Sequence, residues 1–283
     1  MNILFRNIPL TRIKILCAKI LYRITSLFLN TQKKRVIKRN GINFEVDLTE
    51  GLDFSLFVFG SFQSHVYKNK YINLKNDDII FDIGANIGIM ALNFAKNSPK
   101  GKVYAFEPTQ YALEKLNRNI NLNPNLNANV IVTNCFISEK SNINPEIIAF
   151  SSWSLTKRTT EDHKHHLGTP MSTSGVPSLS MDDFVNNNNI SRIDFIKVDT
   201  DGHEYEVFLG AKKTISLLRP KIIFELGLYV MEEKNIKFDF YWNYFVPLIY
   251  KLYDSKSLQE ITFDNYGKHI PKYGSIDILA IPQ

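Results

Sequence analysis

Short apolar runs alternate along the chain with segments of helical period, and this alternation gives the first view of the fold. Two apolar runs end at Asp82 and Glu107, with a glycine turn and a helical segment between them. Further strands are predicted at residues 42–47, 128–135, 146–151, 221–227, 248–254, 259–263 and 275–282, and in the first part of 193–204. Helices are predicted within residues 51–74 and at 110–121, 180–187 and 203–218. Strand–helix alternation predicts an α/β fold, a mostly parallel sheet with helices on both faces.

Residues 152–178 break this alternation, because they are polar and have no clear period. A loop this long in a compact domain is typically a lid or a binding loop, or it is disordered. It contains the spacing H-x-H-H at His163, His165 and His166. This spacing in a loop is weak support for a metal site, so a solvated loop tip is the favoured interpretation.

The first 40 residues differ from the rest in charge. They hold ten basic side chains and no acidic one, which leaves 24 basic and 28 acidic residues for 41–283. Apolar residues from Ile13 to Phe28 recur at steps of three and four, with Arg12, Lys19 and Arg23 on another side. This pattern predicts a basic amphipathic helix. Its apolar face either contacts an anionic membrane, through residues 1–35, or packs on the domain.

Size and composition limit the possible classes of protein. With 283 residues, 44% of them hydrophobic, the chain can bury one large core. Cys17 and Cys135 lie far apart in dissimilar contexts, which favours neither a disulfide framework nor a thiolate metal site. No apolar run reaches the roughly 18 residues of a membrane-spanning helix. These features predict a cytoplasmic protein, peripheral on the membrane if its first helix binds lipid.

The glycine turn after the run that ends at Asp82 carries the most specific chemistry. Its pattern is D-x-G-x-x-x-G, with Asn86 where a dinucleotide-binding turn has its second glycine. The Asn86 side chain and the Asp82 charge both disfavour a pyrophosphate. They suit S-adenosylmethionine, whose ammonium Asp82 could attract at short range. Glu107 lies near the spacing at which an acid binds ribose hydroxyls in such units.

Polar residues end five of the predicted strands: Asp82, Glu107, Asn134, Asp199 and Glu225. In a parallel sheet these ends meet at one edge, where ligands bind. Asp199, Asp201, His203 and Glu204 share one short turn at that edge. Either Asp199 or His203 could act as the general base or the substrate orienter for transfer to a hydroxyl. A divalent metal on Asp199, Asp201 and Glu225 is the less favoured alternative, so no metal is predicted.

Several motifs occur in an order that resembles the FkbM-type S-adenosylmethionine-dependent methyltransferases. These motifs are FDIGANIG, FEP, VPSLSMDDF, IDFIKVDTDGHEYEVFLGA and PKIIFELG, and the resemblance covers about residues 40–227. It implies a Rossmann-like class I methyltransferase fold, a seven-stranded sheet with its last strand antiparallel, and it assigns residues 41–283 to this domain. Members mostly methylate hydroxyls on glycans or natural products. A sugar, glycan or glycolipid acceptor is therefore expected.

The resemblance also assigns site residues. It implies that the cofactor binds to Asp82, Gly84, Ala85, Asn86, Gly88 and Glu107. It places Thr133–Asn134 along the adenine and Asp199 near the transferred methyl. The chain departs from the family pattern at Asp201, where Glu is frequent, and at Cys135–Phe136, where small residues are expected and where the adenine slot could be narrowed.

Three other functions are weighed against this one. A nucleotide-dependent oxidoreductase is disfavoured by Asn86 in the turn. A non-catalytic membrane-associated module would keep the fold without turnover, and the acids Asp82 and Glu107 argue against lost cofactor binding. A nucleic-acid methyltransferase is disfavoured because no N-P-P-Y-like segment follows the third or fourth strand, so no nucleic-acid partner is expected.

Overall fold

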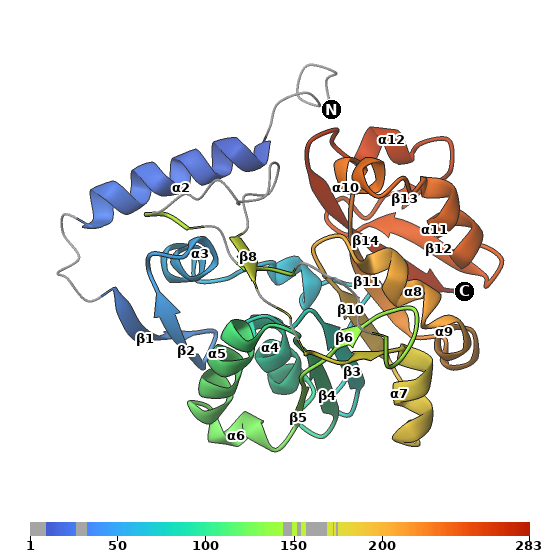
Figure 1. Cartoon of the computed structure of the whole chain (residues 1–283), viewed down its shortest axis with the longest axis horizontal. Helices are drawn as coiled ribbons and strands as arrows, with labels where there is room; N and C mark the ends of the chain where they lie inside the picture. The colour runs from blue at the N-terminus through green and yellow to red at the C-terminus, as the bar shows by residue number, and fades with distance from the viewer. Residues whose placement is uncertain are drawn as a thin grey trace.

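The computed structural model describes residues 10–26, 33–143, 149–151, 154–156, 169–171, 173 and 175–283, and its centre is an eight-stranded sheet (Figure 1). The strands lie in the order β13-β12-β14-β11-β10-β3-β4-β5. Their bounds are β3 Ile79–Ile83, β4 Lys102–Phe106, β5 Val130–Thr133, β10 Phe195–Val198, β11 Lys221–Gly227, β12 Tyr250–Asp254, β13 Glu260–Ile261 and β14 Ser275–Pro282. Neighbouring strands from β5 to β11 pair in parallel, and β14 is antiparallel to both β11 and β12.

This topology confirms the expected methyltransferase fold. Seven strands form the predicted mostly parallel sheet, with the last strand of the chain, β14, antiparallel. The one difference is β13, a short edge strand that pairs antiparallel with β12 and raises the count to eight. A two-residue edge strand adds few ladder hydrogen bonds, and it offers little template for pairing with another chain.

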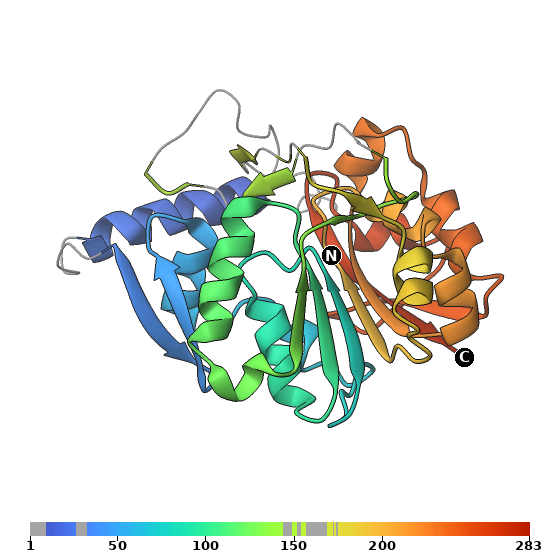
Figure 2. The ribbon, with the colours of Figure 1, turned by 60° about the horizontal axis from the view of Figure 1, so that its bottom comes forward.

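Helices cover both faces of the sheet (Figure 2). One face packs on helices that come before or between the first strands: α3 Gly51–Phe59, α4 Ile89–Asn97 and α5 Gln110–Asn121. The other packs on helices from the second half: α7 Met181–Asn187, α8 Glu204–Leu209, α9 Lys212–Leu218, α10 Leu228–Glu233 and α11 Phe238–Phe245. Short helices lie at α6 Pro124–Asn127 and α12 Tyr266–His269. Because helices cover both faces of the sheet, its parallel strands are continuous apolar runs in the sequence.

The N-terminal region forms a small layer against α3. Helix α2 spans Leu10–Ser26, and a hairpin of β1 (Lys34–Arg39) and β2 (Ile42–Asp47) follows it. The hairpin spans the predicted boundary between the extension, residues 1–40, and the methyltransferase domain, residues 41–283, and that boundary stays a prediction. Within the described part of the chain, no helix has both the length and the apolar character needed to cross a bilayer.

Two segments differ from their sequence-based prediction. The helix predicted over 203–218 is two helices, because Gly210 packs so closely on Ser138 that a Cβ atom would lie 2.0 Å from the Ser138 carbonyl oxygen. Asp182 then accepts hydrogen bonds from the Lys213 and Thr214 N–H groups and starts α9 anew. The described parts of 149–179 hold three short strands, β7 Ala149–Ser151, β8 Thr169–Met171 and β9 Ser178–Leu179, and β9 pairs with β6 Phe136–Ile137. His163, His165 and His166 lie outside the described residues.

Candidate cofactor and acceptor site

The turn after β3 is built around Gly84. Its φ is +75°, and a Cβ atom there would lie 1.9 Å from the backbone oxygen of Asp199, so only glycine fits. The N–H groups of Gly84 and Ala85 both donate to the Phe106 carbonyl, at 3.0 and 2.9 Å. Gly88, with φ +87°, ends the turn and starts α4. The turn is therefore a fixed backbone cradle between the tips of β4 and β10.

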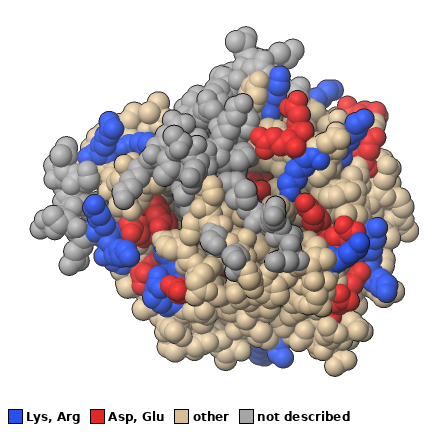
Figure 3. Space-filling model, viewed as in Figure 1, with Lys and Arg blue, Asp and Glu red and all other residues tan. Residues whose placement is uncertain are grey.

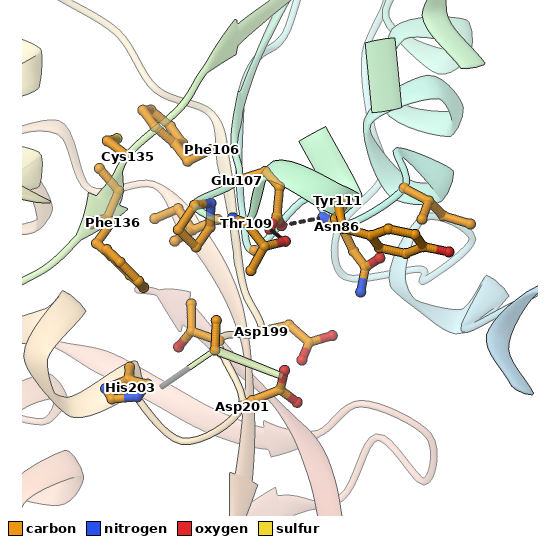
Figure 4. Close-up of a pocket in the computed structure, with 18 of the residues that line it drawn as sticks. Asn86, Phe106, Glu107, Thr109, Tyr111, Cys135, Phe136, Asp199, Asp201 and His203 are labelled. Carbon is orange, nitrogen blue, oxygen red and sulfur yellow. Dashed lines mark hydrogen bonds between the residues drawn. The ribbon is translucent and has the colours of Figure 1, made fainter. Parts of the chain in front are cut away.

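Glu107, at the tip of β4, faces this cradle (Figure 4). One carboxylate oxygen accepts from the Asn86 N–H at 2.8 Å, and the other accepts from the N–H and hydroxyl of Thr109 at 2.9 and 2.6 Å. Burial raises the pKa of Glu107, while the hydrogen bonds from Thr109 and Asn86 lower it in part. The side chain is thus held in one orientation beside the turn.

Asp82 lies beneath the turn, fully buried, and it does not line the cleft. Lys197, on the neighbouring strand β10, places its Nζ 3.2 Å from the Asp82 Oδ1, 3.6 Å from the Asp199 Oδ2 and 2.9 Å from the Gly84 carbonyl oxygen. Burial raises the pKa of Asp82, and the charge of Lys197 opposes that rise. The sequence-based prediction placed the Asp82 carboxylate against a ligand ammonium, but here the carboxylate faces the Lys197 ammonium.

A cleft opens over the turn and holds about 790 Å³ of empty space, counting open solvent at its mouth. Five of the predicted site residues line it: Gly84, Asn86, Glu107, Asp199 and His203. The structure brings these five together from the tips of β3, β4 and β10, as the parallel sheet predicts.

Asn134 belongs to the predicted residues that do not line the cleft, together with Asp82, Ala85 and Gly88. Its amide nitrogen donates to the carbonyl oxygens of Glu107 and Pro108, at 2.8 and 3.0 Å. It therefore fixes the bend after β4. The next two residues, Cys135 and Phe136, line the cleft on that side.

Sequence reasoning missed the wall contributed by α3 and α5. Glu50, Leu52 and Asp53 line the cleft from the start of α3, and Tyr111 lines it from the first turn of α5. The Tyr111 hydroxyl donates to Glu50. Tyr111 could have been predicted from the sequence, because it lies four residues after Glu107, in the first turn of the helix that follows β4. Nothing in the sequence near Glu50 marks it, because it comes from outside the strand tips.

The turn between β10 and α8 forms the opposite wall. Asp199, Thr200, Asp201 and His203 all line the cleft there. Thr200 donates from its N–H and its hydroxyl to Glu204, at 2.8 and 2.9 Å, which closes the turn. Asp201 is exposed at this wall.

Two charged side chains, those of Lys234 and Glu206, lie beside the His203 ring. Its Nδ1 lies 2.9 Å from the Lys234 Nζ and 3.5 Å from the Glu206 Oε1, and Lys234 also pairs with Glu206 at 3.1 Å. Lysine has donors and no acceptor, so the closer contact requires a lone pair on Nδ1. In the neutral ring this leaves the hydrogen on Nε2.

Among the residues described, no group of three or more His, Cys, Asp or Glu side chains is arranged to hold a metal ion. Glu225, part of the less favoured metal alternative, instead accepts a hydrogen bond from the Ser275 hydroxyl and does not line the cleft. The arrangement offers a glycine cradle, one fixed carboxylate and an acidic turn around a single cleft.

Two curated proteins and a solved structure are among the proteins similar to this chain. Methyltransferase sdnD of Sordaria araneosa is 28% identical over 172 residues, which are 53% of this chain and 65% of that protein. Hexuronic acid methyltransferase AglP of Haloferax volcanii is 29% identical over 136 residues, which are 48% and 51% of the two chains. The match therefore spans less than two thirds of either relative.

The crystal structure of Methyltransferase FkbM from Methylobacillus flagellatus KT is similar with a TM-score of 0.45 at 16% identity, over 74% of this chain and 44% of that one. The sequence model of the Methyltransferase FkbM domain matches residues 82–254, from the glycine turn to the end of β12. The match contains every strand tip that lines the cleft. The chain belongs to the FkbM methyltransferase family.

Proposed function

We propose that this methyltransferase uses S-adenosylmethionine to methylate a hydroxyl group of a sugar, glycan or glycolipid. The observation that carries the proposal is the junction of three strand tips in one cleft, where Glu107 faces the Gly84 cradle and Asp199 borders it. A relative that is named a hexuronic acid methyltransferase supports the sugar as acceptor class.

The residues present fit this cofactor. Gly84 lines the cleft, and the absence of a side chain lets its turn pack against the Asp199 backbone. The Glu107 oxygens have lone pairs left for vicinal ribose hydroxyls. Asn86 and Gly88 shape the turn, while Asp82 and Asn134 support it from positions outside the cleft.

The bound cofactor supplies an electrophilic methyl group on a sulfonium. Transfer would form a C–O bond at the acceptor and break the C–S bond of the cofactor, and the hydroxyl proton would pass to a base of the protein. Asp199 is the proposed base, because the Lys234 contact leaves the His203 ring with a hydrogen on Nε2. His203 would then donate to the acceptor and orient it. Orientation of this kind can lower the activation barrier by about 7 kcal/mol in favourable cases.

Calorimetry with S-adenosylhomocysteine and NADH tests the cofactor. We expect binding of the first and none of the second, and we expect Glu107→Ala to weaken S-adenosylhomocysteine binding at least about tenfold. The matched control is Glu114→Ala, whose carboxylate lies on the exposed side of α5. Wild-type affinity in Glu107→Ala would contradict the pocket assignment, and tight NADH binding would revive the oxidoreductase alternative.

Labelled methyl donor and a panel of extracted glycolipids and free sugars test the acceptor. Transfer to a hydroxyl should be lost in Asp199→Asn and reduced in His203→Gln, with S-adenosylhomocysteine affinity close to the wild type in both. Label found only on nitrogen or carbon atoms would overturn the proposed O-methylation.

We also propose that α2 rests on an anionic membrane surface. Ala18, Leu21 and Tyr22 pack on the core, and the Tyr22 ring lies 5.5 Å from the ring of Phe54. A second stripe at four-residue spacing points outward, with Leu16, Ile20 and Ile24 each at least half exposed. Helix α2 is thus apolar on two sides, and its packing on the domain uses only one of them.

Charge completes this argument, because residues 1–40 carry ten basic and no acidic side chains. Figure 3 shows basic side chains on the α2 and β1 side of the molecule, with a few acidic ones among them. Flotation with anionic liposomes should fall in the variant with serine at Leu16, Ile20 and Ile24. It should not change in the control Leu217→Ser, which alters an exposed leucine on α9. Equal flotation of both variants would refute the contact.

A further inference from the structure

The S-adenosylmethionine ammonium needs a partner within the proposed site, and Asp82 is poorly placed to be that partner. Its carboxylate is fully buried beneath the turn and is matched by Lys197, whose Nζ lies 3.2 Å away. A cation that approached from the cleft would meet the Gly84 backbone first. Asp82 is therefore closed off from the cleft, and it shares the ammonium of Lys197 with Asp199.

The cleft itself has two chemically different ends. Phe106, Cys135 and Phe136 lie at one end and Asn86 and Tyr111 at the other, with Glu107 and Thr109 between them (Figure 4). Aromatic and apolar side chains suit a purine ring. A nucleoside whose ribose lies at Glu107 and whose base lies at the apolar end extends its amino-acid part toward Asn86 and Tyr111.

Glu50 is the acid at that polar end. It precedes the first turn of α3, makes no capping hydrogen bond with its side chain, and is 21% exposed. The Tyr111 hydroxyl donates to its Oε1 and so fixes the carboxylate at the cleft wall. Its remaining lone pairs are open to a further donor.

The neighbouring charges leave this end negative. Lys115 Nζ lies 3.7 Å from the Glu50 Oε2, but Lys115 also forms a buried ion pair with Asp53. Two carboxylates thus share one ammonium, and the group of three carries a net charge of −1 when all are ionised. Inside a cleft of low dielectric, a second ammonium is attracted to such a group.

We propose that Glu50, and not Asp82, binds the α-ammonium of the cofactor, with Tyr111 holding the carboxylate in place. This inference rests on the proposed use of S-adenosylmethionine. It assigns a cofactor-binding role to a residue outside the matched family region, which begins at residue 82.

The test compares two ligands that share a nucleoside. S-adenosylhomocysteine carries the ammonium, and 5′-methylthioadenosine lacks the whole amino-acid part. By calorimetry, Glu50→Gln should weaken S-adenosylhomocysteine binding about tenfold and change 5′-methylthioadenosine binding less than about twofold, the loss expected for one charge-assisted hydrogen bond. Asp82→Asn and Asp199→Asn should show no such selective loss. Glu45→Gln, which changes a partly exposed glutamate of β2 that pairs with Arg118, is the matched control.

A second measurement compares two ligands first on the wild-type protein and then on Glu50→Gln. An S-adenosylhomocysteine derivative with hydrogen in place of the amino group should bind the wild type about tenfold more weakly than the parent. In Glu50→Gln the two ligands should bind almost equally. Equal losses of both nucleosides in Glu50→Gln, or a selective loss in Asp82→Asn or Asp199→Asn, would overturn the assignment. A wild-type protein that binds neither nucleoside would instead refute the cofactor proposal on which it rests.

Discussion

Replacement of Lys197 by methionine would leave the Asp82 carboxylate buried without its counter-charge. Both side chains lie on the same face of adjacent parallel strands, Lys197 is 5% exposed and Asp82 is fully buried. Removal of one partner from a buried ion pair costs about 3–5 kcal/mol of unfolding free energy, because the remaining charge is uncompensated. We expect Lys197→Met to fall within this range.

The other two variants complete a thermodynamic cycle. Asp82→Asn should cost less, about 1–3 kcal/mol, since Lys197 keeps the Gly84 carbonyl and Asp199 as partners. The double variant removes both charges and loses mainly the hydrogen bond to Gly84. We expect it to cost about 1–2 kcal/mol, so the coupling between the two sites is at least about 2 kcal/mol.

Urea unfolding followed by circular dichroism and by fluorescence measures all three costs, and coincident transitions are required for the free energies to be meaningful. The exposed pair Lys251–Glu260, with 3.4 Å between its charged atoms, provides a matched cycle in which each change should cost less than about 1 kcal/mol. If the costs of Asp82→Asn and Lys197→Met simply add in the double variant, the two charges do not stabilise each other, and the account of this buried pair is wrong.

Three further outcomes are expected. Gly84→Ala should weaken S-adenosylhomocysteine binding more than tenfold in calorimetry, because its Cβ would lie 1.9 Å from the Asp199 backbone oxygen; unchanged affinity would show that the turn can move. Burial raises the pKa of Asp53 to about 6, so the folded protein binds the proton more tightly than the unfolded chain does, and the Asp53 contribution to stability falls as pH rises from about 4 to 6. That slope of unfolding free energy against pH should be missing in Asp53→Asn, and an identical slope in both proteins would contradict it. Asp182→Ala should cost about 1 kcal/mol in urea unfolding, because the Lys213 and Thr214 N–H groups lose their acceptor, and a cost of zero would mean that α9 needs no cap.

Much of the fold could be predicted from the sequence where the hydrophobic period and the turn or capping residues indicate the same element. Four elements have the predicted bounds to the residue: 42–47, 110–121, 221–227 and 275–282. The helix predicted over 203–218 failed because the reason for its break is tertiary, the packing of Gly210 against Ser138. The hairpin strand at 34–39 was missed because four of its six residues are basic, which hides the alternation of a strand.

The candidate site shows the same division between local pattern and tertiary contact. Strand ends predicted which edge of the sheet holds the acids, and Glu107 and Asp199 do face one cleft. The sequence could not show that Asp82 would face Lys197, since a lysine within an apolar run gives no sign of its partner. Glu50 could not be found either, because its distance from the sheet edge depends on how α3 packs.

The positions of three polar side chains of the sheet depend on how its strands are aligned. Asp82, Lys197 and Glu225 lie on one side of the sheet only because β3, β10 and β11 pair in their particular register. A slip of one residue would send each side chain to the opposite side, into the aromatic layer under α8 and α11. Gly84 and Asp199, which follow β3 and β10 and line the cleft, depend on the same alignment, so the proposed cofactor would bind only correctly aligned chains. Its binding energy would favour that alignment over slipped alternatives during folding.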